Sequence, residues 1–192
     1  FMIVTDISIS DHDGAVVAEN MGNCELFNIR GNVELPRVEG NLQASNVQAL
    51  QERKGIAGNA VLTSISRIEI GLVGGNLTVQ NAESVRTGPV GGSLEAGGIA
   101  AEFQCGSVAG NCTLHDCGNV ALQLSNVGGN LQIDRAGVAS ISSSNVGGNL
   151  TLATTFATGS NTRLMAGGNA TITLPEHADL RIYAMAGGSV VG

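Results

Sequence analysis

Hydrophobic and polar residues alternate along most of the chain in short runs, and each run is closed by glycine. Residues 130–133 read Asn-Leu-Gln-Ile, and residues 120–124 read Val-Ala-Leu-Gln-Leu. A period of two over a short stretch rich in branched apolar residues predicts a half-buried β-strand. Only residues 47–54 could form a turn or two of helix.

The strands belong to a repeat. The sequence Val-Gly-Gly-Asn-Leu-Thr-Val at 73–79 returns with small changes at 127–133 and 146–152. The second glycine of each copy, or its equivalent, recurs every 17–20 residues, at Gly22, Gly40, Gly58, Gly75, Gly92, Gly110, Gly129, Gly148, Gly168 and Gly188. Stacking each repeat on the previous one gives every strand the same two neighbours.

This regularity predicts an all-β protein, a β-solenoid of about ten coils with 17–20 residues and two main strands per coil. The repeat does not decide whether each coil also has a short third face. Coils stack at about 4.8 Å, so ten of them make a rod of about 50 Å. We expect a single domain over 1–192, with an N-terminal strand or first coil over 1–21 and regular repeats over 22–192.

The composition agrees with this fold. Glycine accounts for 28 of the 192 residues and aromatic residues for only 3%. Corners require either a positive φ or a close approach of two backbones, and glycine permits both. The narrow space between stacked sheets favours small and branched side chains over rings.

If coils stack, residues at one repeat position form a column. The position after the second glycine is asparagine in eight of ten repeats and serine in the other two. We expect a structural ladder, in which these side chains bond their equivalents in adjacent coils or cap the backbone of the turn. Its members are Asn23, Asn41, Asn59, Asn76, Asn111, Asn130, Asn149 and Asn169. The alternative is a polar face that binds a repetitive ligand.

A second, outward column carries several threonines. It reads Gln43, Val61, Thr78, Glu95, Thr113, Gln132, Thr151 and Thr171. Rows of threonine could suit ice or a polysaccharide, but valine, glutamate and glutamine interrupt the row, and threonine favours strands in any case. The Asn-x-Thr glycosylation sequons of these repeats follow from the same strand motif.

The four cysteines fall at core positions. Cys24 and Cys112 stand where other repeats place leucine, and Cys105 and Cys117 also take inward positions, so we expect small apolar fillers. A disulfide between Cys105 and Cys112 across their shared corner is possible. A metal site that combines Cys105, Cys112 and Cys117 with His115 would lack a recognised ligand spacing.

One cluster of charged residues falls on neighbouring coils. His115 and Asp134 share a repeat position, and Asp116 and Arg135 share the next. Stacking makes them cross-strand neighbours, which predicts a solvated charge pair. A catalytic role would need a cleft and a second carboxylate, so we expect no enzyme, no catalytic residue, no metal and no cofactor.

The charge excludes some partners. Sixteen acidic and nine basic residues give a net charge of −7. Such a chain lacks the cationic surface that binds nucleic acid or an anionic membrane. No apolar run approaches the length of a transmembrane helix, and no signal peptide is evident.

The repeated Val-Gly-Gly-Asn-Leu-Thr-Leu pattern resembles the bacterial adhesin-type β-solenoid family, which is built from tandem Gly-Gly-Asn-Leu strands. Residues 168–182, with a Leu-Pro-x-x-Ala-Asp link, add to the resemblance. It implies a surface or extracellular location and no catalytic residues. Bactofilins, cytoplasmic β-solenoids that polymerise end to end, are a second resemblance that rests on coil length alone.

Both ends of the repeat look suited to assembly. Phe1, Ile3 and Ile7 lie in a strand-like segment, and Val190 and Val191 belong to a coil that is only beginning. Open coils recruit other chains. We therefore expect a structural protein that stacks head to tail with itself into a fibre or serves as an adhesin-like scaffold. The alternatives are a bactofilin-like cytoplasmic polymer and a polysaccharide- or ice-binding module.

Overall fold

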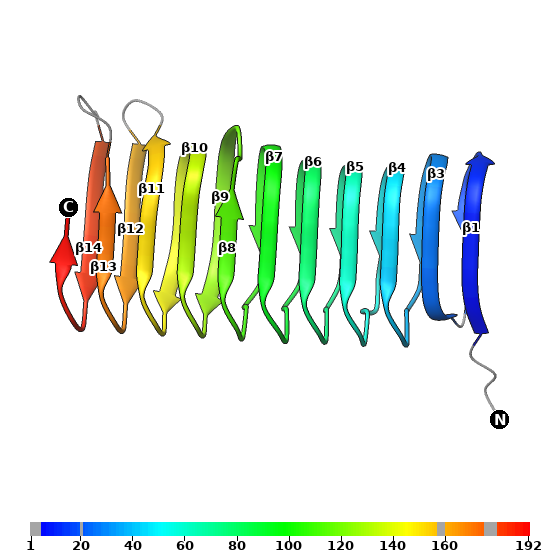
Figure 1. The fold of residues 1–192 in the computed structure, drawn as a ribbon, viewed down its shortest axis with the longest axis horizontal. Helices are drawn as coiled ribbons and strands as arrows, with labels where there is room; N and C mark the ends of the chain where they lie inside the picture. Colours follow the sequence, from blue (N-terminus) through cyan, green and yellow to red (C-terminus); the bar gives the residue numbers. More distant parts are fainter. Residues whose placement is uncertain (1–4, 20, 157–159, 175–179) are drawn as a thin grey trace.

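A computed structural model describes residues 5–19, 21–156, 160–174 and 180–192. These residues form a single parallel sheet of fifteen strands that winds into a β-solenoid of about ten turns, and none of them is helical (Figure 1). The strands lie across the long axis of the rod, and β1 and β15 stand at its opposite ends. The predicted fold class is confirmed.

The strands follow the repeat along the whole chain. They are β1 (Thr5–Asp13), β2 (Val16–Val17), β3 (Met21–Leu35), β4 (Leu42–Glu52), β5 (Ala60–Ile70), β6 (Leu77–Thr87), β7 (Leu94–Cys105), β8 (Cys112–His115), β9 (Asn119–Val127), β10 (Leu131–Val146), β11 (Leu150–Phe156), β12 (Ser160–Ala166), β13 (Ala170–Thr173), β14 (Leu180–Ala186) and β15 (Val190–Val191).

One coil has two long sides and one very short side. In β4 the alternation of buried and exposed residues shifts at Asn46, where φ is 53°, so that Ala44 and Val47 both point inward. The strand bends there and supplies both long sides. The third side is one bridging residue per coil, such as Val38 or Ile56, each paired with its equivalents in the adjacent coils. The short third face therefore exists.

Adjacent coils pair in the register that the repeat predicts. The first inward residue of each coil is the partner of the same residue in the next coil. This column consists of Cys24, Leu42, Ala60, Leu77, Leu94, Cys112, Leu131, Leu150 and Ala170, all 0–2% exposed. The core is thus a set of apolar columns that run along the rod.

The short helix considered for residues 47–54 is wrong. Residues 47–52 continue strand β4, with Val47, Leu50 and Glu52 pointing inward. Strands β3 and β5 on either side offer backbone partners that an isolated helical turn would leave unpaired.

The glycine corners owe their composition to close packing. A Cβ on Gly75 would lie 2.3 Å from the side-chain oxygen of Asn59, and one on Gly91 would lie 2.4 Å from the carbonyl oxygen of Gly74. Both distances are too short for any side chain. Neither glycine has a positive φ, so close approach is the operative reason at these positions.

Candidate functional site

The eight predicted ladder asparagines stand in one column, and each acts in one direction. The side-chain oxygen of Asn41 accepts a hydrogen bond from the backbone N–H of Asn59 at 2.8 Å, and that of Asn59 accepts from Asn76 at 2.8 Å. The same bond repeats along the column to Ser189. The ladder therefore caps the backbone of the next coil along its length, and at its start the amide nitrogen of Asn41 also donates to the side-chain oxygen of Asn23 at 3.3 Å.

The ladder includes residues other than asparagine. The hydroxyl oxygen of Ser93 accepts from the N–H of Asn111 at 3.1 Å. Asp6 starts the column, since its carboxylate accepts from the N–H of Asn23 at 2.7 Å. No Gly-Gly pair precedes Asp6, so the sequence pattern did not include it.

A second column, which the sequence analysis missed, marks the bend of the coils from β1 to β10. Its members follow the ladder residue by five positions and have φ between 46° and 66°. They are Asp11, Asn28, Asn46, Ser64, Asn81, Gly98, Asp116 and Arg135. Apart from Ser64 and Arg135, these residue types are common in the left-handed region, so the signal was present in the sequence. At one end the amide nitrogen of Asn28 donates to Asp11 at 2.9 Å, and that of Asn46 donates to Asn28 at 3.0 Å.

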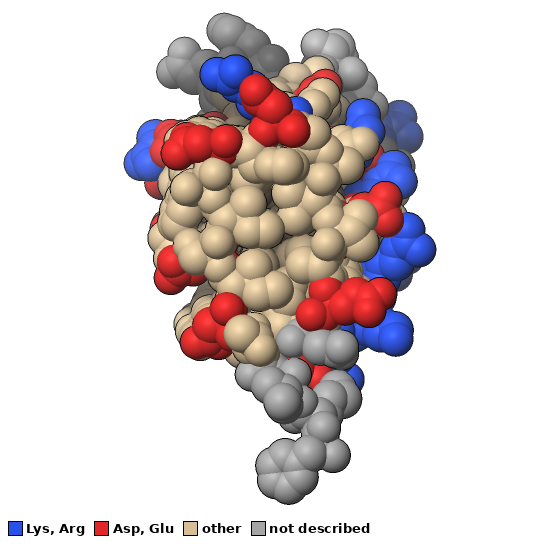
Figure 2. Space-filling model, turned by 90° about the vertical axis from the view of Figure 1, so that its right-hand side faces the viewer, with Lys and Arg blue, Asp and Glu red and all other residues tan. Residues whose placement is uncertain are grey.

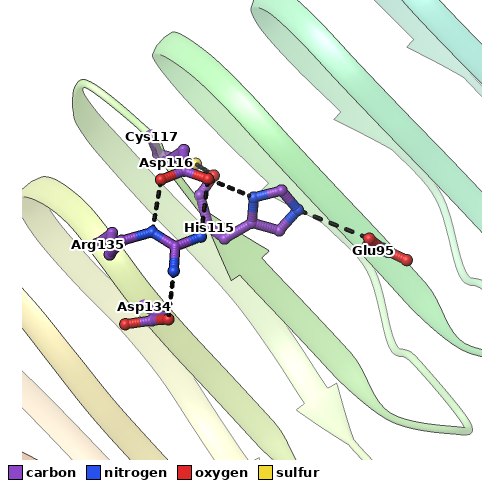
Figure 3. A network of polar contacts seen from close by, with 6 residues as sticks. All are labelled: Glu95, His115, Asp116, Cys117, Asp134 and Arg135. Carbon is purple, nitrogen blue, oxygen red and sulfur yellow. Dashed lines mark hydrogen bonds and ion pairs between the residues drawn. The ribbon is translucent and has the colours of Figure 1, made fainter.

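The charged cluster of His115, Asp116, Asp134 and Arg135 forms a network across neighbouring coils (Figure 3). Arg135 holds Asp116 with two hydrogen bonds, from Nε at 2.8 Å and from a terminal nitrogen at 3.0 Å. Its other terminal nitrogen lies 3.3 Å from Asp134. His115 Nδ1 lies 2.9 Å from the Asp116 carboxylate. The expected contact of Asp116 with Arg135 is therefore present. His115 and Asp134 are strand partners, but the His115 side chain contacts Asp116.

The network extends to a third coil through Glu95. His115 Nε2 lies 3.6 Å from this carboxylate, on the side of the ring away from Asp116. The imidazole reaches it across Gly97, where a Cβ would stand 2.4 Å from His115 Cε1. Glycine at this position therefore leaves the space that the ring occupies.

The electrostatics of the network keep one carboxyl ionised. Hydrogen bonds from Arg135 and then from His115 hold the pKa of Asp116 well below its ordinary value of 3.8. The same contact raises the pKa of Arg135. The side chains of Arg135 and Asp116 are 64% and 52% exposed, so water screens their attraction. This arrangement ties neighbouring coils together.

The four cysteines are buried, free thiols, and the possible Cys105–Cys112 disulfide is not formed. The two residues occupy different columns, because Cys105 pairs with Thr87 and Leu124 while Cys112 pairs with Leu94 and Leu131. Burial raises the pKa of Cys24 to about 11 and that of Cys105 to about 12, which keeps both thiols protonated and unreactive. Among the residues that the structure describes, no three metal-ligating side chains are grouped to hold an ion.

A buried carboxylate that the sequence analysis missed closes one corner. Glu52 is 2% exposed and pairs with Leu35 of the preceding coil. Both belong to a column of inward-facing residues that is otherwise largely apolar. Its carboxylate accepts backbone hydrogen bonds from Lys54 at 2.9 Å, Gly55 at 2.6 Å and Gly71 at 3.2 Å. These contacts satisfy a charge that would otherwise be costly to bury.

The outward threonine column is in register along the rod, from Gln43 to Thr171. Val61, Glu95 and Gln132 separate its threonines, so the hydroxyls do not form one uninterrupted row.

The structure describes three of the five residues expected at the assembly ends. Ile7 in β1 is half-buried against the core, whereas Val190 and Val191 in β15 are 52% and 59% exposed. Phe1 and Ile3 lie outside the described residues. Among the described residues, each end strand has a neighbour on one side only: β1 and β2 pair with β3, β14 with β12 and β15 with β13.

No helix within the described ranges has the length and apolar character to cross a bilayer. No family model, curated protein or solved structure matches the chain.

Proposed function

We propose that this chain is a non-enzymatic structural protein, a β-solenoid subunit that stacks head to tail with copies of itself into a fibre. The observation that carries the proposal is the pair of open sheet edges, β1 with β2 at one end of the rod and β14 with β15 at the other. Unpaired parallel strands present backbone donors and acceptors that another chain can bind.

The use of the polar residues supports a structural role. The ladder oxygens bind the backbone of the next coil, and the Glu52 carboxylate binds its own corner. His115 and Arg135 bind neighbouring carboxylates. Each of these groups is therefore engaged in a contact within a coil or between neighbouring coils, as expected of residues that hold a scaffold together.

For the location, we propose the cell surface or the extracellular space, where the fibre would act as an adhesin-like scaffold. The tandem Gly-Gly-Asn-Leu strands that resemble adhesin-type solenoids support this. Immunogold labelling of intact cells tests it: gold at the surface supports the proposal, and label confined to the cell interior contradicts it.

The second candidate is a cytoplasmic polymer of the bactofilin type. The specific observation in its favour is the set of four free thiols, since secreted proteins commonly oxidise their cysteines to disulfides. Both candidates share the fibre and differ in compartment, so the same labelling experiment separates them.

The fibre itself is tested by electron microscopy and sedimentation of the purified protein over a range of concentrations. We expect rods that lengthen with concentration in multiples of about 50 Å, the length of ten stacked coils. Dispersed single rods at the highest concentration would contradict the fibre.

A further inference from the structure

We propose that two copies join in register, so that the last coil of one copy continues every column of the first coil of the next. At this junction Ser189, Val190 and Val191 lie beside Asp6, Ile7 and Ser8 of the second copy. Tyr183 lies beside its Val17. The inference deepens the proposed fibre and rests on it, but it specifies one contact among the many that a fibre could use.

The strongest support is one column on the long side that follows the bend. Its side chains face outward wherever the structure describes them. Strand pairing connects its ten members without a gap. They are Val17, Glu34, Gln51, Glu69, Arg86, Gln104, Gln123, Ser142, Arg163 and Tyr183. All eight interior members are polar, and the two apolar members stand at the two ends.

These two end residues are exposed where a second copy would cover them. Val17 is 71% exposed and Tyr183 is 61% exposed. An apolar residue on a solvated side is ordinary when it is single. Here two of them share a column and meet only if one copy follows another in register, and their contact would remove apolar surface from water.

The first inward column gives the same register. It starts with Ile7, runs through members that are 0–2% exposed, and ends with Val190, which is 52% exposed. Val190 is exposed because no described coil lies beyond it. A second copy in register would place Ile7 there and complete the core column.

The asparagine ladder is complementary at the two ends. Each ladder oxygen accepts from the N–H of the next coil, so the last member, Ser189, presents a hydroxyl acceptor at one end. The first member, Asp6, presents a backbone N–H at the other. Ser93 shows that serine accepts this bond within the rod, at 3.1 Å from the nitrogen of Asn111.

The charge of the β1 end favours head-to-tail stacking over a contact between two β1 ends. β1 contains Asp6, Asp11 and Asp13 and no lysine or arginine, and the end view shows acidic side chains on several sides of an uncharged centre, with Lys and Arg at other points of the same edge (Figure 2). Two such ends facing each other would bring like charges together, which is unfavourable. The opposite end can meet this one without that repulsion.

Cysteine cross-linking tests the register directly. Adjacent strands are about 4.8 Å apart, within the 4.4–6.8 Å between Cα atoms that a disulfide spans. We would mix two single variants, Val191→Cys and Ser8→Cys, and oxidise them. The matched control replaces Ser8→Cys with Ser10→Cys, two residues along the same face and about 8 Å from position 191 in this register. The native thiols are at most 6% exposed and stay protected.

The expected result is a covalent dimer from the first mixture and none from the control. An equal or larger yield from the Ser10→Cys mixture would overturn the register while leaving head-to-tail stacking intact. Cross-linking of Val191→Cys with itself would overturn both. Fibres in the microscope without any cross-link would overturn the register alone, and the absence of both fibres and cross-links would remove the proposed function as well.

A second variant pair tests the apolar contact without cross-linking. Tyr183→Asp places a charge at the junction, whereas Gln104→Asp places the same charge in the same column at the middle of the rod. We expect the first to raise the concentration needed for assembly by about tenfold or more, the effect of about 1.4 kcal/mol per junction. The second should leave it unchanged. Equal effects of the two variants would contradict the contact.

Discussion

At the scale of single residues, the asparagine ladder explains how a glycine-rich corner keeps its register. The corner glycines lack side chains because the coils approach too closely there, as at Gly75 and Gly91. The next residue then supplies a polar side chain that reaches the following coil. Asparagine suits this position because its carbonyl oxygen can accept a backbone N–H one coil away.

Asn76 gives a direct test of the ladder. Replacing it with alanine removes the acceptor for the N–H of Ser93, now at 2.8 Å, and we expect a loss of about 1 kcal/mol in the free energy of unfolding. The variant Asn76→Ser should lose less, because Ser93 performs the same task. Urea unfolding of the two variants and the parent protein gives the comparison, and an Asn76→Ala variant as stable as the parent would show that the side-chain oxygen contributes nothing.

The contacts of Asp116 make the free energy of unfolding depend on pH in the acidic range. Hydrogen bonds from Arg135 and His115 hold the pKa of this carboxyl below 3.8, so the unfolded chain binds a proton there before the folded protein does. The stabilisation is present above about pH 4 and is lost as the pH falls below that value. The parent protein should therefore lose more stability between about pH 4 and pH 2 than the variant Asp116→Asn.

The asparagine variant is a suitable reference for this measurement. Asp116 has a φ of 51°, a conformation that asparagine adopts readily, so the backbone is not strained by the change. Urea midpoints measured from neutral to acidic pH would settle the comparison. Parallel pH profiles for the two proteins would show that the carboxyl contributes no acid sensitivity.

At the scale of the strand, the bend at the left-handed column decides the shape of the coil. Spacing alone showed which residues share a column, because like residues recur every 17–20 positions. It did not show that one strand serves two sides, since alternation continues on both sides of the bend and only its phase shifts. The buried Glu52 was also missed, because its partners are backbone groups that no pattern of side chains reveals.

Ser64 tests the bend within β5. This exposed residue has a φ of 55°, which a β-branched side chain tolerates poorly. We expect Ser64→Val to cost about 1–2 kcal/mol in the free energy of unfolding, and Ser64→Gly to leave stability unchanged or higher. Thermal or urea unfolding distinguishes the two, and a tolerated valine would show that the bend is not required.

Glu52 tests the corner after β4. In Glu52→Gln one carboxylate oxygen becomes an NH₂ group, which cannot accept from the backbone donors of Lys54, Gly55 or Gly71. We expect a loss of about 1–3 kcal/mol, the usual result of an unsatisfied buried group. The exposed Glu69, substituted in the same way, is the matched control and should change stability little. A similar loss in both variants would mean that the corner contacts do not matter.

At the scale of the whole molecule, the solenoid itself was predictable because its cause is repetition. Ten copies of one short motif, with alternating strands between them, leave few arrangements that pair every backbone group. The side-by-side placement of His115 with Asp134, and of Asp116 with Arg135, followed from the same stacking. The contribution of Glu95 did not, because it depends on an imidazole lying across Gly97, which is a matter of side-chain space rather than of position in the repeat.

The transverse strands have a mechanical consequence. Since β1 and β15 lie at opposite ends, tension applied between the two ends of the rod loads the hydrogen bonds of one coil at a time. In a single-molecule pulling experiment we expect low, evenly spaced ruptures, each releasing 17–20 residues, or about 60 Å of extended chain. One abrupt release of the whole length would contradict this. Under load the protein would yield coil by coil and shorten again when the tension fell, as an extensible tether does.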